Sequence, residues 1–274
     1  MDARGYLVER AALLEPFLEA ALPAASAPPA ALHAAMRHLL FPGGKRLRPG
    51  FCFAACEAAG GSPERALPAA AAVELVHTYS LVHDDLPCMD DDTTRRGRPT
   101  VHVAYGEALA VLAGDALLAL AFEVLAQGAD AAALVELARA AGSRELVGGQ
   151  ALDLTFAADG VADARAVEAV HERKSAALIA VSVGLGARLG GAERGLCERL
   201  RGFGREVGLA FQIADDLLDA GGDGACSLVR ALGGPAARAR AEALLAAALA
   251  RIQDLGVHAE PLRQLARYAV RRDA

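Results

Sequence analysis

Two clusters of aspartates have residue types and spacing suited to chemistry. The first is DDLPCMDDD at residues 84–92, and the second is DDLLD at residues 215–219. Each follows a mostly apolar stretch of helical character, so each is expected at the C-terminal end of a helix. The partial negative charge of a helix C-terminus and the repulsion between adjacent carboxylates both oppose this placement. A bound cation would offset both penalties.

The spacing within the clusters indicates which cation. Asp215 and Asp219 are four residues apart and share a helix face, as do Asp216 and Asp219. Pro87 ends or bends the earlier helix, which lets Asp90 turn back toward Asp84. Carboxylates at this spacing suit Mg²⁺, which completes its shell with water and substrate phosphates, whereas zinc and an EF-hand calcium loop fit poorly. A solvated acidic helix end is the alternative, and it is weaker for two clusters than for one.

Three basic segments could bind anions. GGKRLRP at residues 43–49 places three cations after two glycines, RRGR at residues 95–98 directly follows the first acidic cluster, and Lys174-Ser175 lies inside a predicted helix. Each segment alone is also consistent with a solvated surface. Together they would supply cations for two diphosphate groups, with metal ions bridging to the carboxylates.

Histidine 77 is a further candidate for binding phosphate. It lies seven residues before Asp84 and therefore within about 20° of it on an ideal helix. A lone histidine on an apolar helix is usually structural, but His77 is aligned with the acidic cluster. His83 has no comparable argument and is expected to be structural.

The composition restricts the class of protein. Over half of the 274 residues are apolar, alanine and leucine dominate, and aromatic residues are scarce, which favours helices. The formal net charge of −6 makes nucleic acid a poor candidate partner. Cys52 and Cys56 are expected to be small apolar fillers, and the absence of CxxC spacing fits a reduced, cytoplasmic setting. The charged N-terminus does not look like a signal peptide, and no apolar run suggests a membrane span.

The elements that must position these residues are predicted to be helices, with weak strand signals throughout. Residues 90–100 are expected to form a loop. No linker divides the chain and no repeat of fixed period is present, so a single all-α domain over residues 1–274 is predicted. The predicted helices span approximately residues 5–21, 29–40, 50–59, 63–86, 106–127, 131–156, 163–190, 192–219, 234–255 and 258–271.

The motifs resemble those of the trans (E-type) polyprenyl diphosphate synthases. HDDLPCMDDDTTRRGRPT resembles the first aspartate-rich motif of that family and FQIADDLLD the second. GGKRLRP, LAGDALL, GGQALDL and ERKSAAL match other family segments in order, so that residues 30–220 are covered closely. The resemblance implies a helical bundle of the isoprenoid synthase type with a central cavity, in a homodimer. It also implies magnesium, with about three ions per site once substrate is bound.

Roles for individual residues follow from this resemblance. The expected magnesium ligands are Asp84, Asp85, Asp90, Asp215 and Asp219. The expected catalytic set adds Lys174, Ser175, Gln212 and Asp216. Arg95 and Lys174 would hold an allylic diphosphate, and the expected isopentenyl diphosphate ligands are Gly44, Lys45, Arg48, His77 and Arg96. The implied reaction ionises the allylic diphosphate, and the double bond of isopentenyl diphosphate attacks the resulting cation in a dry cavity. A proton is then lost to the departing diphosphate.

The product length is expected to depend on the residues just before the first motif. Ser80 lies one helical turn before Asp84 on the same face, whereas Tyr79 is indicated only by the resemblance. A tyrosine there beside DDLPCMD resembles bacterial farnesyl diphosphate synthases, so a fifteen-carbon farnesyl product is predicted from dimethylallyl and geranyl primers. A geranylgeranyl product is the alternative, because plant-like geranylgeranyl synthases share DDLPCMD.

The chain departs from the family after Asp219, where a further lysine motif is usual and none is present. Arg230 could substitute, or the chain could be a weakly active partner subunit of another synthase. A terpene cyclase is less favoured because it would lack a second diphosphate pocket like GGKRLRP. A helical module without chemistry would leave the two acidic helix ends unexplained. The terminal Arg271-Arg272 would either cover the cavity mouth or extend into solvent.

Overall fold

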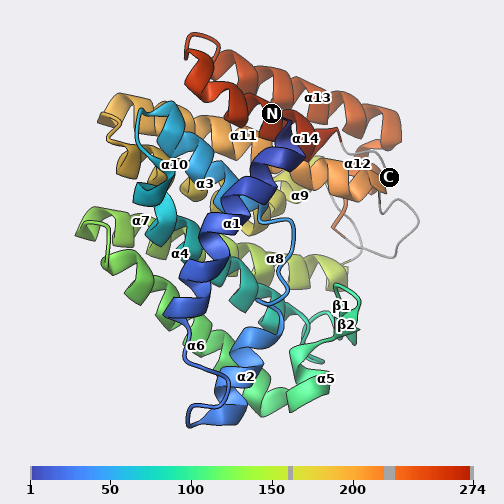
Figure 1. The fold of residues 1–274 in the computed structure, drawn as a ribbon. Helices are drawn as coiled ribbons and strands as arrows, with labels where there is room; N and C mark the ends of the chain where they lie inside the picture. Colours follow the sequence, from blue (N-terminus) through green and yellow to red (C-terminus); the bar gives the residue numbers. More distant parts are fainter. Residues whose placement is uncertain (1, 160–162, 219–225, 272–274) are drawn as a thin grey trace.

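Three apolar helices lie at the centre of the protein. They are α3 (Leu47–Ala58), α4 (Pro63–Asp84) and α10 (Ala177–Gly190), and most side chains of each are buried around the helix. Alanine-rich sequence favours the helical state, and helices that are apolar on every face belong inside a bundle. The computed structural model describes residues 2–159, 163–218 and 226–271 (Figure 1), with side chains 156–159 left out.

Small residues allow α3 and α10 to pack closely. A Cβ atom on Gly186 would lie 2.0 Å from the carbonyl oxygen of Cys52, and one on Gly190 would lie 2.5 Å from that of Cys56. Both cysteines are fully buried and carry free thiols. They act as small apolar fillers at a close helix contact, as the sequence predicts.

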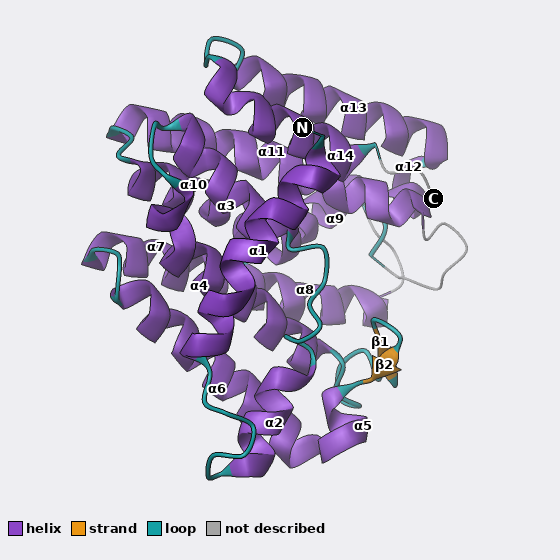
Figure 2. Ribbon diagram, viewed as in Figure 1, coloured by secondary structure: helices purple, strands orange, loops and turns teal. Residues whose placement is uncertain are grey.

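The remaining helices surround this centre (Figures 1 and 2). The N-terminal helix α1 crosses α3 and α4, α6 runs along α4, and α13 packs on α11. The outer elements are α1 (Ala3–Ala21), α2 (Ala30–His38), α5 (Val101–Tyr105), α6 (Glu107–Ala126), α7 (Ala131–Ala141), α8 (Leu146–Asp159), α9 (Ala164–His171), α11 (Arg194–Leu218), α12 (Leu228–Leu232), α13 (Gly234–Arg251), the 3-10 turn η2 (Val257–Ala259) and α14 (Glu260–Val270).

Several predicted boundaries are wrong. The predicted helix 131–156 is two helices, α7 and α8, because the chain leaves the helical conformation at Gly142. The predicted helix 163–190 contains a π-helical turn, η1 (Glu172–Ala176), between α9 and α10. The expected loop at 90–100 contains an antiparallel hairpin of β1 (Thr94–Arg95) and β2 (Arg98–Pro99). Helical periodicity does not detect such short interruptions, because the apolar pattern continues through them.

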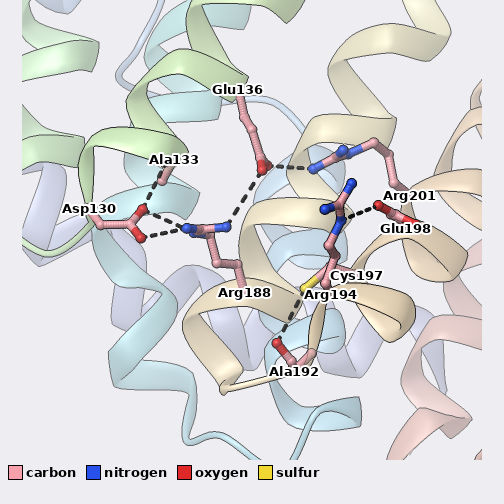
Figure 3. Close-up of polar contacts among 9 residues, drawn as sticks. All are labelled: Asp130, Ala133, Glu136, Arg188, Ala192, Arg194, Cys197, Glu198 and Arg201. Carbon is pink, nitrogen blue, oxygen red and sulfur yellow. Dashed lines mark hydrogen bonds and ion pairs between the residues drawn. The ribbon is translucent and has the colours of Figure 1, made fainter.

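An ion-pair chain ties the connection before α7 to α10 and α11 (Figure 3). The Asp130 carboxylate accepts from the Ala133 backbone N–H and from Arg188. Glu136 lies 3.7 Å from Arg188 and 2.5 Å from Arg201. These side chains are partly exposed, so each pair contributes little alone, although a shared network restrains the helices relative to one another.

Two further features concern the surface. Within the described ranges one helix, α6, has the length and apolar composition of a membrane span, and 44% of the residues in that window are buried, so by itself it is weak evidence for a span. A core helix of a water-soluble bundle meets the same criteria, and α6 packs along α4. At the C-terminus, Arg271 donates to Glu242 of α13 at 2.7 and 3.0 Å, and Arg272 lies outside the described residues.

Candidate active site

A pocket of about 240 Å³ lies between α4 and α8. Its α4 wall includes Tyr79, Ser80 and Asp84, and its α8 wall includes Gln150 and Leu154. Most of the surface is apolar, with the Asp84 carboxylate as an ionisable group in the wall. Tyr79 and Ser80 thus border the same hollow as the first aspartate, although an ideal helix would place Tyr79 well around from Asp84.

The first acidic cluster turns back on itself as predicted. Helix α4 ends at Asp84, and the Asp90 backbone N–H donates to the Asp84 carbonyl oxygen at 2.9 Å. Burial raises the pKa of Asp84 to about 7, with Lys174 acting against the shift and Asp90 adding to it. Burial also raises the pKa of Asp90, and nearby Asp153 adds to that shift. These carboxylates are short of positive charge.

Asp85 has a different environment from Asp84. It is fully buried, and its Oδ1 atom accepts from Arg95 Nε at 2.5 Å, while its Oδ2 atom has no hydrogen-bond partner. Arg95 also donates to Asp92 at 2.7 Å. The two contacts anchor the β1–β2 hairpin to the end of α4, so that Arg95 lies beside the first acidic cluster.

Lys174 lies among carboxylates from three elements. Its Nζ atom donates to Asp153 Oδ2 of α8 at 2.5 Å. Burial lowers the pKa of Lys174, but Asp153, Asp84 and Asp90 outweigh that effect and raise the pKa above its ordinary value. The π turn η1 carries both Lys174 and Ser175, and it packs against α8 and α11. Lys174 therefore links the first acidic cluster to the interior of the bundle.

The second acidic cluster is held by a chain of side-chain contacts. Ser175 Oγ donates to Gln212 Oε1 at 2.6 Å, and Gln212 Nε2 donates to Asp216 Oδ1 at 3.3 Å. Asp216 Oδ2 also accepts from the Leu228 backbone N–H at 2.9 Å. Asp215 lies in the same final turn of α11, and Asp219 lies outside the described residues. The structure thus brings Ser175, Gln212 and Asp216 together.

Cys226 lies near Asp153 and Asp216. Burial raises the pKa of its thiol to about 12, and Asp153 and Asp216 both add to the shift. His171 Nε2 lies 3.3 Å from the Cys226 carbonyl oxygen and 3.7 Å from Asp216 Oδ2. The residues just before α12 therefore contact Asp216 and the partner of Lys174.

The predicted isopentenyl diphosphate ligands gather near the start of α3. Burial lowers the pKa of His77 well below its ordinary value, and the cations Arg48 and Arg96 lower it further, so the imidazole is neutral. Lys45 and Arg96 are exposed, and a Cβ atom on Gly44 would lie 2.8 Å from the Arg96 guanidinium. The structure thus places the 43–49 segment against the hairpin arginines.

Arg46, in contrast, is not available to an anion. Its side chain is only 3% exposed and forms ion pairs with Glu74 at 2.6 Å and Glu15 at 2.8 Å. The sequence groups Arg46 with the anion-binding cations of GGKRLRP, and that grouping is wrong. The backbone at Arg46 has φ of 50°, in the left-handed region.

The donor set fits magnesium, although no group of three acidic, histidine or cysteine residues in the described ranges is preassembled around one point. Mg²⁺ commonly uses one or two carboxylates and takes its remaining ligands from water and phosphates. The raised pKa of Asp84 and the unpartnered oxygen of Asp85 indicate carboxylates that lack compensating charge. A divalent cation would supply it.

Sequence reasoning missed three polar residues near the pocket. Asp153 is the partner of Lys174, and His171 contacts Asp216. Both amide atoms of Gln150 are buried without a hydrogen-bond partner. An acidic side chain inside the apolar GGQALDL stretch was the available signal for Asp153. His171 and Gln150 had no comparable signal, because their environment depends on helix packing.

Known proteins are similar to this chain in sequence and in fold. The family model described as Polyprenyl synthetase matches residues 29–228. The heterodimeric geranylgeranyl pyrophosphate synthase large subunit 1 of Arabidopsis thaliana is 46% identical over 229 residues, covering 80% of this chain and 61% of that protein. The geranylgeranyl pyrophosphate synthase of Capsicum annuum is 49% identical, covering 70% of this chain and 54% of that protein. The chain thus spans about three fifths or less of these relatives' length.

Solved structures agree over nearly the whole chain. An FPP/GFPP synthase from Zymomonas mobilis has a TM-score of 0.91 and 39% identity, covering 98% of this chain and 99% of that one. A geranylgeranyl pyrophosphate synthetase from Pyrococcus horikoshii has a TM-score of 0.89 and 30% identity, covering 99% of this chain and 98% of that one. The predicted all-α isoprenoid synthase fold is confirmed. The chain belongs to the polyprenyl synthetase family.

Proposed function

We propose that this protein is a prenyltransferase that joins isopentenyl diphosphate to an allylic diphosphate. The observation that carries the proposal is the position of Lys174, whose ammonium interacts with Asp153, Asp84 and Asp90 beside an apolar pocket. A second basic group around His77 lies close by and would receive the other diphosphate. Residues 1–274 would act as one domain, which the continuous cluster of buried apolar side chains supports.

The carboxylates would prepare the allylic site. Asp84 and Asp90 from the first cluster and Asp215 from the second are the proposed magnesium ligands, with Asp85 and Asp219 nearby in sequence. Magnesium, when bound, would supply positive charge against the leaving diphosphate. Asp85 would act mainly by orienting Arg95 toward that diphosphate, because one of its oxygens already binds the guanidinium.

The side chains of η1 and α11 would assist ionisation. Lys174 and Arg95 would neutralise negative charge that grows on the diphosphate as the allylic C–O bond breaks. The Ser175–Gln212–Asp216 chain would hold the end of α11 against η1. The pocket wall formed by Tyr79, Leu154 and their neighbours would keep water from the allylic carbocation.

Isopentenyl diphosphate would bind at the group of cations around His77 of α4, apart from the allylic site. Lys45, Arg48 and Arg96 would contact its diphosphate, and Gly44 would let the backbone approach. His77 is neutral and would donate a hydrogen bond without adding charge. Holding the double bond near the allylic carbocation would convert the condensation into an effectively unimolecular step. The new carbocation would then lose a proton to the departing diphosphate, which gives the longer allylic product.

The proposed product is geranylgeranyl diphosphate. The synthases from Arabidopsis and Capsicum bear that name, which supports the alternative product over the farnesyl product predicted from Tyr79. The position of Tyr79 in the pocket wall favours farnesyl diphosphate as the second candidate, because a buried aromatic ring limits the length of the cavity. Product analysis separates the two.

The assembly and the compartment are also proposals. Exposed apolar residues on α5 and α6, namely Val103, Val111 and Leu112, support a homodimer that buries this face. The Arabidopsis relative is named a subunit of a heterodimer and is chloroplastic, so a partner subunit and a plastid setting are alternatives to a cytoplasmic homodimer. Sedimentation of the purified chain would show whether it self-associates.

The test of the proposed function uses the purified protein alone. Dimethylallyl diphosphate, labelled isopentenyl diphosphate and magnesium are added, and the dephosphorylated products are separated by chromatography. Condensation products that disappear with a chelator or with Asp84→Asn would support the proposal. No product from the folded protein would reject it as an autonomous synthase and favour the partner-subunit alternative.

A further inference from the structure

Four consecutive backbone carbonyls at the end of α2 accept hydrogen bonds from arginine side chains. Arg98 Nη1 donates to the carbonyls of His38 and Phe41 at 3.0 and 2.8 Å. Arg96 Nη1 donates to Leu39 at 2.9 Å, and Arg46 Nη2 donates to Leu40 at 2.7 Å. We call residues 38–41 the carbonyl cap. His38 is the last residue of α2 and Leu39 caps it, and carbonyls at a helix end lack intrahelical partners and carry partial negative charge, so guanidinium groups are favourable there. Leu40 and Phe41 follow the helix, and arginine side chains bind their carbonyls too.

The three arginines come from two separate segments. Arg46 belongs to the 43–49 segment, whereas Arg96 and Arg98 belong to the hairpin. Both segments carry residues proposed to bind isopentenyl diphosphate. The carbonyl cap is therefore the common surface on which both anion-binding segments rest.

The backbone of both segments is adapted to this contact. Arg46 and Arg96 have φ values of 50° and 55°, in the left-handed region that non-glycine residues rarely adopt. A Cβ atom on Gly43 would lie 2.0 Å from the Arg46 guanidinium carbon. Arg46 has three polar partners and cannot move away, so Gly43 is required for its position. Such backbone conformations persist where surrounding contacts over-determine them.

The buried ion pair between Arg46 and Glu74 has no clear advantage for the stability of the fold. The Arg46 and Glu74 side chains are 3% and 2% exposed, and they lie 2.6 Å apart. Burying both charges costs desolvation energy, and apolar replacements of such pairs are often neutral or stabilising. A geometric role explains the pair better. Glu74 lies on α4 one turn before the candidate ligand His77, so the pair fixes the 43–49 segment close to that ligand.

We propose that Arg46 and Arg98 are positioning residues, which fix the 43–49 segment and the hairpin on the carbonyl cap so that Lys45, Arg48 and Arg96 meet one diphosphate. This inference rests on the proposed function. Arg46 and Arg98 themselves need not touch the substrate. Their contacts join α2, α3 and the hairpin before isopentenyl diphosphate arrives, which lowers the ordering needed on binding.

The test compares two altered proteins with a matched control. Arg46→Met with Glu74→Leu removes the buried pair without leaving a lone buried charge, because Glu15, the other partner of Arg46, has a side chain that is 38% exposed. Arg98→Met removes two contacts to the carbonyl cap. Arg10→Met with Glu57→Leu is the control, because Arg10 and Glu57 form a half-buried pair between α1 and the far end of α3. Calorimetry measures isopentenyl diphosphate binding without added metal, and circular dichroism checks folding.

We expect isopentenyl diphosphate affinity to fall at least tenfold in both altered proteins, with the KM for dimethylallyl diphosphate changed less than twofold. The control should change neither quantity by more than twofold. Arg98→Lys, which keeps a charge and donors, should recover part of the affinity. If Arg46 and Arg98 had a purely structural role, the altered proteins would bind both substrates more weakly.

Wild-type affinity in folded Arg98→Met protein would overturn the inference, even if the Arg46→Met, Glu74→Leu protein failed to fold. An equal loss for both substrates would also overturn it. The proposed function is tested separately by the unaltered protein. If that protein binds no isopentenyl diphosphate, the proposed function and this inference both fail.

Discussion

The candidate site has an acidic side, formed by the clusters at 84–92 and 215–219, and a basic side, formed by the 43–49 segment, the hairpin arginines and His77. The two sides differ in how their charges are compensated. On the acidic side, burial raises the pKa values of Asp84, Asp85 and Asp90, neighbouring carboxylates add to the shifts, and Lys174 and Arg95 do not fully offset them. On the basic side, the carbonyl cap and Glu74 already partner the guanidinium groups of Arg46, Arg96 and Arg98. We infer that the acidic side is completed by cations that arrive with substrate, whereas three arginines of the basic side are held in place beforehand.

The largest expected effect comes from removing a carboxylate on the acidic side. Asp84→Asn should lower kcat by about 10³-fold, because the carboxylate would no longer help hold the magnesium that stabilises charge developing on the leaving diphosphate. The same change should raise the melting temperature of the metal-free protein at pH 8, because a buried charge is removed. Steady-state kinetics and thermal unfolding measure the two effects. A lower melting temperature for metal-free Asp84→Asn protein at pH 8 would contradict the view that the acidic side lacks compensating charge.

Lys174→Met should have the next largest effect. Loss of this cation should reduce kcat/KM for the allylic diphosphate by about 10²-fold. It should also raise the pKa of Asp84 further, since Lys174 is the group that most opposes the present shift. Kinetics and carboxylate NMR test these outcomes. Arg199→Met is the control, because Arg199 pairs with Asp254 on the surface and should change neither.

Tyr79→Ala tests the pocket wall next to Asp84 on the acidic side. Removing the ring should lengthen the cavity and shift the product ratio toward the next longer prenyl diphosphate by about tenfold, in keeping with the loss of a large apolar contact. Ser80→Ala is a matched change that removes little volume. Chromatography of dephosphorylated products gives the ratio, and an unchanged ratio in Tyr79→Ala would reject Tyr79 as the limit.

Ser175→Ala should have a smaller effect. It removes the hydrogen bond to Gln212, which is worth about 0.5–1.5 kcal/mol, and so lowers kcat by roughly two- to tenfold. Replacement by threonine should preserve the hydroxyl and most of the activity. A loss as large as that of Lys174→Met would mean that Ser175 acts on the substrate directly, not through Gln212.

The smallest expected effect is a pH dependence of stability without metal. The folded pKa of Asp84, about 7, lies above the ordinary carboxylate value, so the folded state binds an extra proton between these values. The Asp84 contribution to stability therefore falls as pH rises toward 7. Asp84→Asn should flatten this slope between pH 5 and 7. Asp254→Asn should not, because the Arg199 hydrogen bond lowers the pKa of Asp254.

Much of the fold was predictable from the sequence because long apolar stretches with helical character dominate it. The central helices α3, α4 and α10 and the turn from Asp84 to Asp90 follow from alanine content, glycine and proline. The π turn at 172–176, the break at Gly142 and the 94–99 hairpin were not predictable. Each is a short departure that tertiary contacts select, and local propensity differs little between the competing conformations.

The sequence by itself determined which charges exist and on which helix ends the aspartates lie, because spacing along a helix sets direction. Only the tertiary structure decided which charges meet. It placed Asp153 against Lys174 and buried Arg46 on Glu74, although Arg46 and Lys45 are neighbours in the chain. The physical reason is that desolvation and hydrogen-bond geometry depend on groups from distant segments, so chemically identical side chains acquire different roles.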